Sequence, residues 1–317
     1  MPDMSAVMEK IRAMFHDSLQ ENVVMANYTT ARVGGKADGL LSVYSCQELE
    51  KAARLLWELE VPFILLGNGS NILVSDRGIR GIVLHNRAHN IKITAHGDTP
   101  TVWVESGATL SQLGQQVALR GLSGLEWASV IPGTVGGAVY GNAGAHGSDM
   151  RCNLIMAEIL QPSGIKEVYS CEQMEYSHRS SILKRNATGA VILAAKMKLT
   201  YSTPQEVQAL MESLIAKRRN SQPVGASMGS MFKNPPGEHA GKLIEAAGLK
   251  GTRVGGVEIS TSHANFFINR GGGTASDYQQ LIQMAQKAVW NKFKIRLELE
   301  IEPVGDWENT NWDASGD

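Results

Sequence analysis

The density of glycine between residues 121 and 147 is the feature that most limits how this chain can fold. The segment reads GLSGLEWASVIPGTVGGAVYGNAGAHG and holds eight glycines. Each glycine loses more backbone entropy on folding than any other residue, so such density needs a structural reason. One reason is a set of backbone amides that lie close to a large ligand, with no Cβ between them. The other is a series of tight turns in a β-rich fold, and this segment alone does not decide between them.

A second glycine loop, GNGSN at residues 67–71, follows the apolar run at 62–66. A strand that runs into an open glycine loop commonly binds phosphate through backbone amides. Neither glycine segment is a P-loop, because no Gly-Lys-Ser/Thr follows the glycines, and neither has the Rossmann spacing GxGxxG. Two such loops in one chain favour a ligand with an extended pyrophosphate, such as a dinucleotide, over tight turns alone.

Length and composition narrow the class of protein. The chain has 317 residues, more than one hydrophobic core usually supports, so two or three domains are expected. A formal net charge of −1 gives no general attraction to nucleic acid, and no apolar run approaches the roughly 20 residues that a membrane-spanning helix needs. Cys46, Cys152 and Cys171 are far apart and lack a CxxC pair, and the N-terminus lacks a signal-peptide pattern. A cytoplasmic protein without disulfides or bound metal is therefore expected.

Hydrophobic periodicity predicts an α+β fold rather than a regular alternation of strands and helices. Helices are expected at residues 4–15, 47–59, 110–119, 204–219 and 240–247, and from Thr274 or Ser276 to about Phe293. Strands are expected at residues 63–66, 81–84, 91–95, 101–106, 156–160, 166–169, 191–199, 254–259, 266–269 and 296–302. The sequence QPVG at residues 222–225 ends one helix and is a candidate domain boundary.

Three further segments carry residue types suited to chemistry. Arg179 lies in YSHRSS (176–181) beside several hydroxyls, and a guanidinium presents a fork of donors to a carboxylate or phosphate. Ser230 and Lys233 lie in GSMFKNPP (229–236), where two prolines stiffen the loop. A serine that donates a proton needs positive charge nearby to stabilise its alkoxide, and Lys233 is a candidate for that charge.

Each of these segments also has an unremarkable interpretation. The arginine is as consistent with a surface loop, and residues 229–236 are as consistent with a rigid turn between domains. Glu298, Glu300 and Glu302 share one face of the expected strand at 296–302, but such a face is most often solvated. Periodicity does not choose among the three glutamates.

In chain order, the motifs resemble the UDP-N-acetylenolpyruvoylglucosamine reductase (MurB) family of bacterial cell-wall synthesis, in its compact second type. The likeness runs from about residue 27 to residue 305. It rests on six motifs: NYTTARVGG (27–35), LGNGSNIL (66–73), IPGTVGGA (131–138), GNAG (141–144), GSMFKNP (229–235) and GGVEIS (255–260). One such motif is weak evidence, whereas six in family order over most of the chain are very specific.

The resemblance implies non-covalent FAD in a fold of the vanillyl-alcohol-oxidase (PCMH) type, followed by a C-terminal α+β substrate domain. The expected division is an N-terminal FAD-binding subdomain at 1–85, a second FAD-binding subdomain at 86–202, the substrate domain at 203–305 and an acidic tail at 306–317. The family's FAD-binding positions match Gly67, Asn68, Gly69, Ser70 and Asn71 at the pyrophosphate, and Ile131, Pro132, Gly133, Gly136, Gly137, Asn142 and Gly144 along the flavin.

The same resemblance implies reduction of UDP-N-acetylglucosamine enolpyruvate to UDP-N-acetylmuramate in peptidoglycan precursor synthesis. Hydride passes from NADPH through the flavin to the vinyl carbon of the substrate. Arg179 and Glu300 match the positions that stabilise the resulting enolate-like intermediate, and Ser230 matches the proton donor that completes the product. Arg218, Lys233 and Asn234 are candidates for binding the UDP-sugar or the nicotinamide nucleotide. A monomer with no nucleic-acid or membrane partner is expected.

Two positions depart from the family pattern. His178 precedes Arg179 where the family usually has tyrosine, and Ser221 stands where members often have lysine, so a phosphate contact has moved to Arg219 or been lost. The nearest rival is an oxygen-using oxidase of the same flavin fold, and a second is a catalytically silent flavin-binding protein. Neither rival accounts for the matches at Ser230 and Glu300.

Overall fold

The computed structural model describes residues 3–308 and residue 312. Contacts between Cα atoms divide the chain into two compact units. Unit 1 consists of residues up to 20, 39–68 and 81–218, and unit 2 consists of residues 21–38, 69–80 and those from 219 on. The expected domain boundaries at 85/86, 202/203 and 305/306 stay a prediction. Of the expected acidic tail, residues 309–311 and 313–317 lie outside the described residues.

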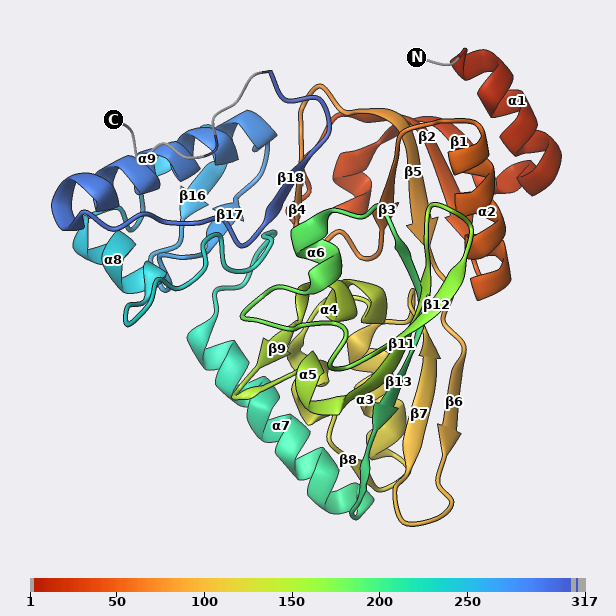
Figure 1. Ribbon diagram of the computed structural model, residues 1–317. Helices are drawn as coiled ribbons and strands as arrows, with labels where there is room; N and C mark the ends of the chain where they lie inside the picture. The colour runs from red at the N-terminus through yellow and green to blue at the C-terminus, as the bar shows by residue number, and fades with distance from the viewer. Residues whose placement is uncertain (1–2, 309–311, 313–317) are drawn as a thin grey trace. The chain divides into compact units, whose positions relative to one another are not determined.

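The elements alternate irregularly along the chain, as Figure 1 shows. The helices are α1 (Met4–Phe15), α2 (Cys46–Glu58), α3 (Leu110–Ala118), α4 (Val135–Gly141), α5 (Met150–Asn153), α6 (Ile182–Asn186), α7 (Pro204–Ser221), α8 (Ala240–Ala246) and α9 (Ala275–Phe293). The strands are β1 (Leu19–Val24), β2 (Lys36–Val43), β3 (Phe63–Leu66), β4 (Ile72–Val74), β5 (Ile79–Asn86), β6 (Ile91–Thr94), β7 (Thr101–Glu105), β8 (Leu122–Ser123), β9 (Gly144–Ala145), β10 (Ser148–Asp149), β11 (Leu154–Leu160), β12 (Lys166–Ser170), β13 (Val191–Lys198), β14 (Thr200–Tyr201), β15 (Arg253–Val254), β16 (Val257–Ile259), β17 (Phe267–Asn269) and β18 (Glu302–Val304).

The expected helices all form, and side-chain caps fix where several of them begin. Ser45, Thr109 and Thr274 precede α2, α3 and α9, and each accepts a hydrogen bond from the backbone N–H three residues later. Such caps satisfy donors that the first turn of a helix leaves unpaired. In unit 2, the Asp76 carboxylate also accepts from the backbone N–H groups of Ala275 and Ser276, both at 2.8 Å. The N-terminus of α9 is thereby fixed to the segment at 69–80.

Unit 1 contains a five-stranded antiparallel sheet in the order β12-β11-β13-β7-β6. The strands expected at 91–95, 101–106, 156–160, 166–169 and 191–199 form this sheet, so these predictions are confirmed. Its core includes Leu113 of α3, Trp127, Val139 of α4 and Met197 of β13, all buried. The strand expected at 63–66 pairs in parallel with β5, where Phe63 lies opposite Ile82.

Unit 2 contains the antiparallel sheet β15-β16-β17, packed with α8 and α9 around the buried rings of Phe232, Phe267 and Tyr278. β18 pairs in parallel with β4. Trp307 and Trp312 pack edge to face with ring centroids 4.7 Å apart, and both contact this core. The described part of the expected tail is therefore docked on unit 2.

Two expected strands differ from the structure. Residues 254–259 do not form one strand, because Gly255 and Gly256 turn the chain between β15 and β16. A Cβ on Gly256 would lie 2.3 Å from the backbone nitrogen of Gly273, so the turn requires glycine there. Residues 296–301 form only an isolated bridge, at Leu299, the chain bends at residues 300–301, and the ladder begins at Glu302. The alternation of apolar and polar residues therefore reflects burial of one side of the segment, where Leu297 and Ile301 lie in the core. It does not indicate a strand paired along its length.

Candidate functional site

The glycine-rich segment contains a helix that the sequence did not predict, α4. Thr134 caps it, and the segment is fixed at its start by hydrogen bonds from Val135 N–H to Ala108 O at 2.9 Å and from Gly136 N–H to Ser106 O at 2.7 Å. Val135, Ala138 and Val139 are buried in the core of unit 1. Packing of this face therefore outweighs the low helix propensity of glycine.

The glycines of α4 differ in whether protein packing explains them. A Cβ on Gly136 would lie 3.0 Å from the Ser106 Cβ, so close packing against Ser106 favours glycine there. Gly141 would meet nothing within 4 Å, and Gly137 would meet only the Thr134 Oγ1, at 3.6 Å. Neither residue is among those with positive φ. Because they lie four residues apart, they share one side of the helix, which we call the glycine face.

The glycine face meets the requirement for a large flat ligand. Glycine costs more backbone entropy on folding than alanine, and a Cβ on Gly141 would meet no atom within 4 Å outside its chain neighbours and the backbone of its own helix. A ligand ring that approaches the bare backbone would need that space. At Gly137 and Gly141 the face presents backbone without a side chain, which lets a flat ring system approach closely. FAD is therefore compatible with the residues present.

The loop at residues 67–71 is divided between the units, with Gly67 and Asn68 in unit 1 and the other three residues in unit 2. In unit 1, a Cβ on Gly67 would lie 2.4 Å from the Thr134 Oγ1, so this glycine lies against the N-cap of α4. In unit 2, Gly69 has φ 59°, and a Cβ on it would lie 2.1 Å from the Tyr28 carbonyl oxygen. Both glycines are thus required by close approaches within their own unit.

Asn71 ends this loop and connects it to Glu300 within unit 2. Its side-chain Nδ2 donates to the Glu300 carbonyl at 3.1 Å, and its own carbonyl accepts from Glu302 N–H at 2.9 Å. The assignment of Ser70 and Asn71 to FAD stays a prediction. What the structure adds is that the last residue of the loop holds the main chain of a candidate catalytic glutamate.

Arg179 lies in a four-residue turn in unit 1, residues 177–180, which we call the arginine turn. Ser177 and Ser180 form an antiparallel bridge through N–H···O bonds of 3.0 and 3.2 Å. Arg179 is the third residue of the turn and has φ 56°. A left-handed backbone is uncommon for a non-glycine residue and marks a position that its surroundings hold.

Three side chains join residues 176–181, which contain the arginine turn, to the C-terminal end of α4. The buried Tyr176 hydroxyl donates to Val139 O at 2.9 Å, and the Ser181 hydroxyl donates to Tyr140 O at 2.6 Å. Asn142 Nδ2 donates to Ser177 O at 3.1 Å. The two hydroxyls satisfy carbonyls that the last turn of a helix leaves unpaired. Burial raises the pKa of Tyr176, so its hydroxyl stays a donor.

Ser230 and Glu300 lie on two neighbouring segments of unit 2 that are joined by a backbone hydrogen bond. Ser230 forms an antiparallel bridge with Phe266, and Met231 N–H donates to Asn265 O at 2.8 Å. On the other side, Glu300 N–H donates to Met231 O at 2.9 Å. Ser230 and Glu300 are therefore close together, because Met231, the residue after Ser230, accepts the hydrogen bond from Glu300 N–H. The two glutamates also differ in exposure, since Glu300 is half-buried and Glu298 is exposed.

The three candidate substrate-binding residues lie in different surroundings. Lys233 N–H donates to Glu298 O at 2.9 Å, and its ammonium forms an ion pair with the Glu298 carboxylate at 3.3 Å. Asn234 Oδ1 accepts from Ala240 N–H, the first residue of α8, at 3.1 Å. Arg218 near the end of α7 donates to Val130 O, next to the expected flavin-lining loop, and burial lowers the pKa of its guanidinium. Their roles stay predictions.

Asn265 is a residue that the sequence analysis missed. It is 3% exposed, its Oδ1 accepts from Phe232 N–H at 3.0 Å, and its Nδ2 donates to Phe232 O at 2.8 Å. The carboxamide thus replaces a strand partner for Phe232, between Ser230 and Lys233. No local pattern could have found it, because the two residues are 33 positions apart.

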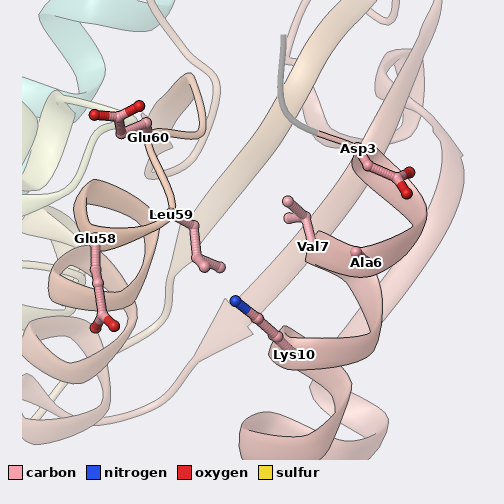
Figure 2. Close-up of a pocket in the computed structure, with 7 residues that line it drawn as sticks. All are labelled: Asp3, Ala6, Val7, Lys10, Glu58, Leu59 and Glu60. Atoms are coloured by element: carbon pink, nitrogen blue, oxygen red, sulfur yellow. The ribbon is translucent and has the colours of Figure 1, made fainter.

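Other features of the described residues add no chemistry to this site. A hollow between α1 and the C-terminal end of α2 is lined by Asp3, Ala6, Val7, Lys10, Glu58, Leu59 and Glu60 (Figure 2). Its charges are of both signs and it is open to solvent. Among residues 3–308 and 312, no group of three or more His, Cys, Asp or Glu residues could hold a metal ion. In the same part of the chain, no helix is both long and apolar enough to span a bilayer.

Comparisons with known proteins agree with this geometry. Residues 37–168 match the family model of an FAD binding domain, and residues 221–304 match that of the UDP-N-acetylenolpyruvoylglucosamine reductase C-terminal domain. The UDP-N-acetylenolpyruvoylglucosamine reductase of Chloroflexus aggregans is 39% identical over 290 residues, covering 90% of this chain and 98% of that protein. That of Bacillus subtilis is 38% identical over 303 residues, covering 95% and 99%.

A solved structure shows the same similarity. The crystal structure of UDP-N-acetylenolpyruvylglucosamine reductase (MurB) from Thermus caldophilus is 36% identical to this chain and superimposes with a TM-score of 0.75. The match covers 89% of this chain and 97% of that one. With the family models, it confirms the expected α+β fold, a PCMH-type FAD-binding fold followed by a C-terminal domain.

Proposed function

The chain belongs to the UDP-N-acetylenolpyruvoylglucosamine reductase family, and from this premise we propose that it reduces UDP-N-acetylglucosamine enolpyruvate to UDP-N-acetylmuramate with electrons from NADPH. As a member of this family it is an FAD-binding oxidoreductase of peptidoglycan precursor synthesis. One observation carries the proposal. A single helix, α4, has an open glycine face and also holds Arg179 through contacts at its C-terminal end.

The glycine face and the loops around it would hold FAD. We propose that residues 131–133, Gly137, Gly141 and the backbone of residues 142–144 lie along the ring system, with the backbone N–H groups of residues 67–71 at the pyrophosphate. When bound, FAD supplies hydride transfer between NADPH and the vinyl carbon of the substrate. The support is the space that a Cβ on Gly141 would fill. No charged side chain is needed there, because backbone amides bind pyrophosphate through their dipoles.

Arg179, Glu300 and Ser230 would carry the polar chemistry. Reduction of the enolpyruvyl double bond leaves negative charge on the carbon next to the substrate carboxylate. A guanidinium stabilises that charge by donating two hydrogen bonds, and its positive charge does not depend on pH near neutrality. Glu300 is assigned to the same intermediate, and the Ser230 hydroxyl is assigned as the donor of the proton that the carbon receives. Preorganised groups of this kind act because they need not reorient as charge develops.

The remaining polar candidates are proposed to bind the nucleotide parts of the substrates. Lys233, Asn234 and Arg218 are assigned to the UDP-sugar or to NADPH, and the Lys233 ammonium already lies in a charged pair with Glu298. A phosphate would compete with that carboxylate for the ammonium. Because the proposed substrates are cytoplasmic metabolites, we place the enzyme in the cytoplasm, and we propose that it acts as a monomer.

Two half-reactions, measured without oxygen, test the proposed function. NADPH should bleach the flavin of the purified FAD-loaded protein, and UDP-N-acetylglucosamine enolpyruvate should then restore its colour. In Ser230→Ala, we expect bleaching at the normal rate and recovery slowed by about 100-fold or more, the usual range for general acid catalysis. The matched control is Ser213→Ala, at an exposed serine of α7, which should change neither rate.

Each outcome has a distinct meaning for the proposal. Protein that NADPH bleaches and only oxygen recolours would be an oxidase of the same fold, and the proposed substrate would be wrong. Equal loss of both half-reactions in Ser230→Ala would contradict the role of Ser230 as proton donor. Recovery by the enolpyruvyl sugar in the wild type, lost selectively in Ser230→Ala, is the result that the proposal requires.

A further inference from the structure

We propose that Asn142 is a positioning residue for Arg179: its carboxamide holds the arginine turn in the geometry that presents the guanidinium. This inference rests on the proposed function, because it deepens the role of Arg179 in the reaction. The role of the Asn142 side chain would then differ from that of the other residues expected along the flavin. Its backbone can lie beside the ligand, while its side chain acts on another protein segment.

The polar atoms of the Asn142 side chain are all used inside the protein. The residue is 4% exposed, and its Oδ1 accepts from Arg151 N–H at 3.1 Å. Its Nδ2 donates to the Asp149 carboxylate and to Ser177 O, each at 3.1 Å. A carboxamide has two N–H donors, and both have protein partners here. The side chain therefore has no N–H left for a ligand.

The contact with Ser177 O acts on the arginine turn itself. The same carbonyl accepts from Ser180 N–H at 3.2 Å and so closes the turn. Tyr176 and Ser181 hold the two ends of the turn, but Asn142 reaches the carbonyl within it. Since Arg179 has φ 56°, an unfavourable conformation for a residue with a Cβ, the turn needs such support to persist.

Asparagine is suited to this position for two reasons. It ends α4 in the left-handed conformation, with φ 46° and ψ 56°, which asparagine tolerates better than most residues with a side chain. It also combines a donor and an acceptor in one planar group. Aspartate at this position would lose the donor to Ser177 O and place a second carboxylate against Asp149.

The arrangement explains how Arg179 and the bound ring could keep one geometry. Asn142 directly follows Gly141, so the helix that offers the glycine face also fixes the arginine turn. Displacement of a reacting group by about 1 Å can slow a reaction on the order of 100-fold. Loss of the Asn142 contact should therefore reduce the reaction that needs Arg179 and leave FAD binding intact.

A double-mutant cycle with Asn142→Gly and Arg179→Lys tests the proposal. Glycine keeps the left-handed backbone and removes only the side chain. The readout is the rate at which UDP-N-acetylglucosamine enolpyruvate recolours the dithionite-reduced, FAD-loaded protein. We expect Asn142→Gly alone to slow this rate on the order of 10- to 100-fold, and to slow it by less than about threefold in the Arg179→Lys background. FAD affinity and NADPH bleaching should stay within about twofold of the wild type in both backgrounds.

A second variant keeps the proposal testable if Asn142→Gly fails to fold. Exchange of the pair, Asn142→Asp with Asp149→Asn, retains hydrogen bonds at 149 and at Arg151 N–H but removes the donor to Ser177 O. The exchange should fold and still recolour slowly. Equal slowing of recolouring by Asn142→Gly in both backgrounds, a matching loss of FAD affinity, or a wild-type rate in the exchange variant would each overturn the inference. If the wild type itself is not recoloured by the enolpyruvyl sugar, the proposed function fails instead.

Discussion

The arginine turn and the segment that carries Ser230 are held by different kinds of hydrogen bond. The arginine turn and the residues on either side of it are joined to the end of α4 by the side chains of Tyr176, Ser181 and Asn142. Around Ser230, the neighbouring segments are joined mainly by their backbones, through Met231 N–H to Asn265 O and Glu300 N–H to Met231 O. One region is fixed by particular side chains, and the other is fixed largely by the path of the chain.

The difference predicts how each region responds to substitution. A side-chain contact disappears with one mutation, whereas a backbone contact persists under most mutations because every residue but proline offers the same N–H and C=O. The geometry of Arg179 should therefore be sensitive to single changes at its anchors. That of Ser230 and Glu300 should be sensitive at few positions, chiefly Asn265, where a side chain replaces a backbone partner.

The largest expected loss of rate follows substitution of Arg179 itself. This substitution tests whether the guanidinium held by the arginine turn is needed for the reaction. Arg179→Lys keeps the charge but loses the bidentate fork. We expect recolouring of the reduced flavin by the enolpyruvyl sugar to slow by about 100- to 1,000-fold, as when one donor to a developing anion is removed. Arg185→Lys is the matched control, since Arg185 is an exposed arginine of α6 paired with Glu175. Similar slowing in both variants would contradict a special role for the turn.

The sequence could predict the elements that depend on local pattern. Capped amphipathic helices such as α3 and α9 were placed to within one or two residues, because the cap and the apolar stripe lie in the same stretch of chain. The segment 296–302 shows the limit of this reasoning. Alternation indicated an extended chain with one buried side, but it contained no information on whether a neighbouring strand would pair with it.

The candidate site likewise has features that the sequence reveals and features that appear only when the chain folds. The glycine loops were recognised from composition and Ser230 from its motif, whereas Glu300 could be chosen only through the family resemblance; the roles of Arg179, Ser230 and Glu300 stay predictions. The helix α4 was missed because three of its seven residues are glycine, and it is stabilised by burial of its other face and by hydroxyls 37 and 41 residues away. The carboxamide contacts of Asn142 and Asn265 likewise join residues 33 to 35 positions apart, so they arise only when the chain folds.

A second prediction tests the Asn265 side-chain contacts in the backbone-held region. Asn265→Ala should leave the N–H and C=O of buried Phe232 without partners and lower the free energy of unfolding by about 2–3 kcal/mol, measured by urea denaturation. Glu298→Gln is the control, because that side chain is 76% exposed and its ion pair should contribute less than about 0.5 kcal/mol. If both variants are equally stable, backbone contacts alone hold Phe232. The region around Ser230 would then depend on side-chain contacts even less than we infer.

A third prediction concerns an anchor of the arginine turn. Tyr176→Phe removes the hydroxyl that donates to Val139 O in a buried site, and should lower the free energy of unfolding by about 1–2 kcal/mol. The control is Tyr201→Phe, where the hydroxyl donates to Gly97 O at the surface and its loss should matter by less than about 0.5 kcal/mol. Equal effects would show that the buried anchor contributes no more than a solvated one, and the comparison would fail.

The smallest expected effect comes from adding a methyl group to α4 at Gly141, on the glycine face. We expect it to raise the stability of the apoprotein and to lower its affinity for FAD. Gly141→Ala places a methyl group where no described atom lies within 4 Å, so the apoprotein should become more stable by about 0.5–1 kcal/mol through reduced entropy of the unfolded chain. The same methyl group would occupy ligand space, and FAD affinity should fall by about tenfold, a loss of about 1.4 kcal/mol.

Gly136→Ala is the matched variant on the packed side of the helix. Its Cβ would lie 3.0 Å from the Ser106 Cβ and 3.1 Å from the Ser106 carbonyl oxygen, so it should lower stability. Urea denaturation of the apoproteins and FAD titration by flavin fluorescence measure both quantities. Gly141→Ala with increased stability and unchanged FAD affinity would mean that the glycine face does not contact the flavin. Increased stability with weakened FAD binding would show that this glycine is kept for the ligand, at the expense of the helix.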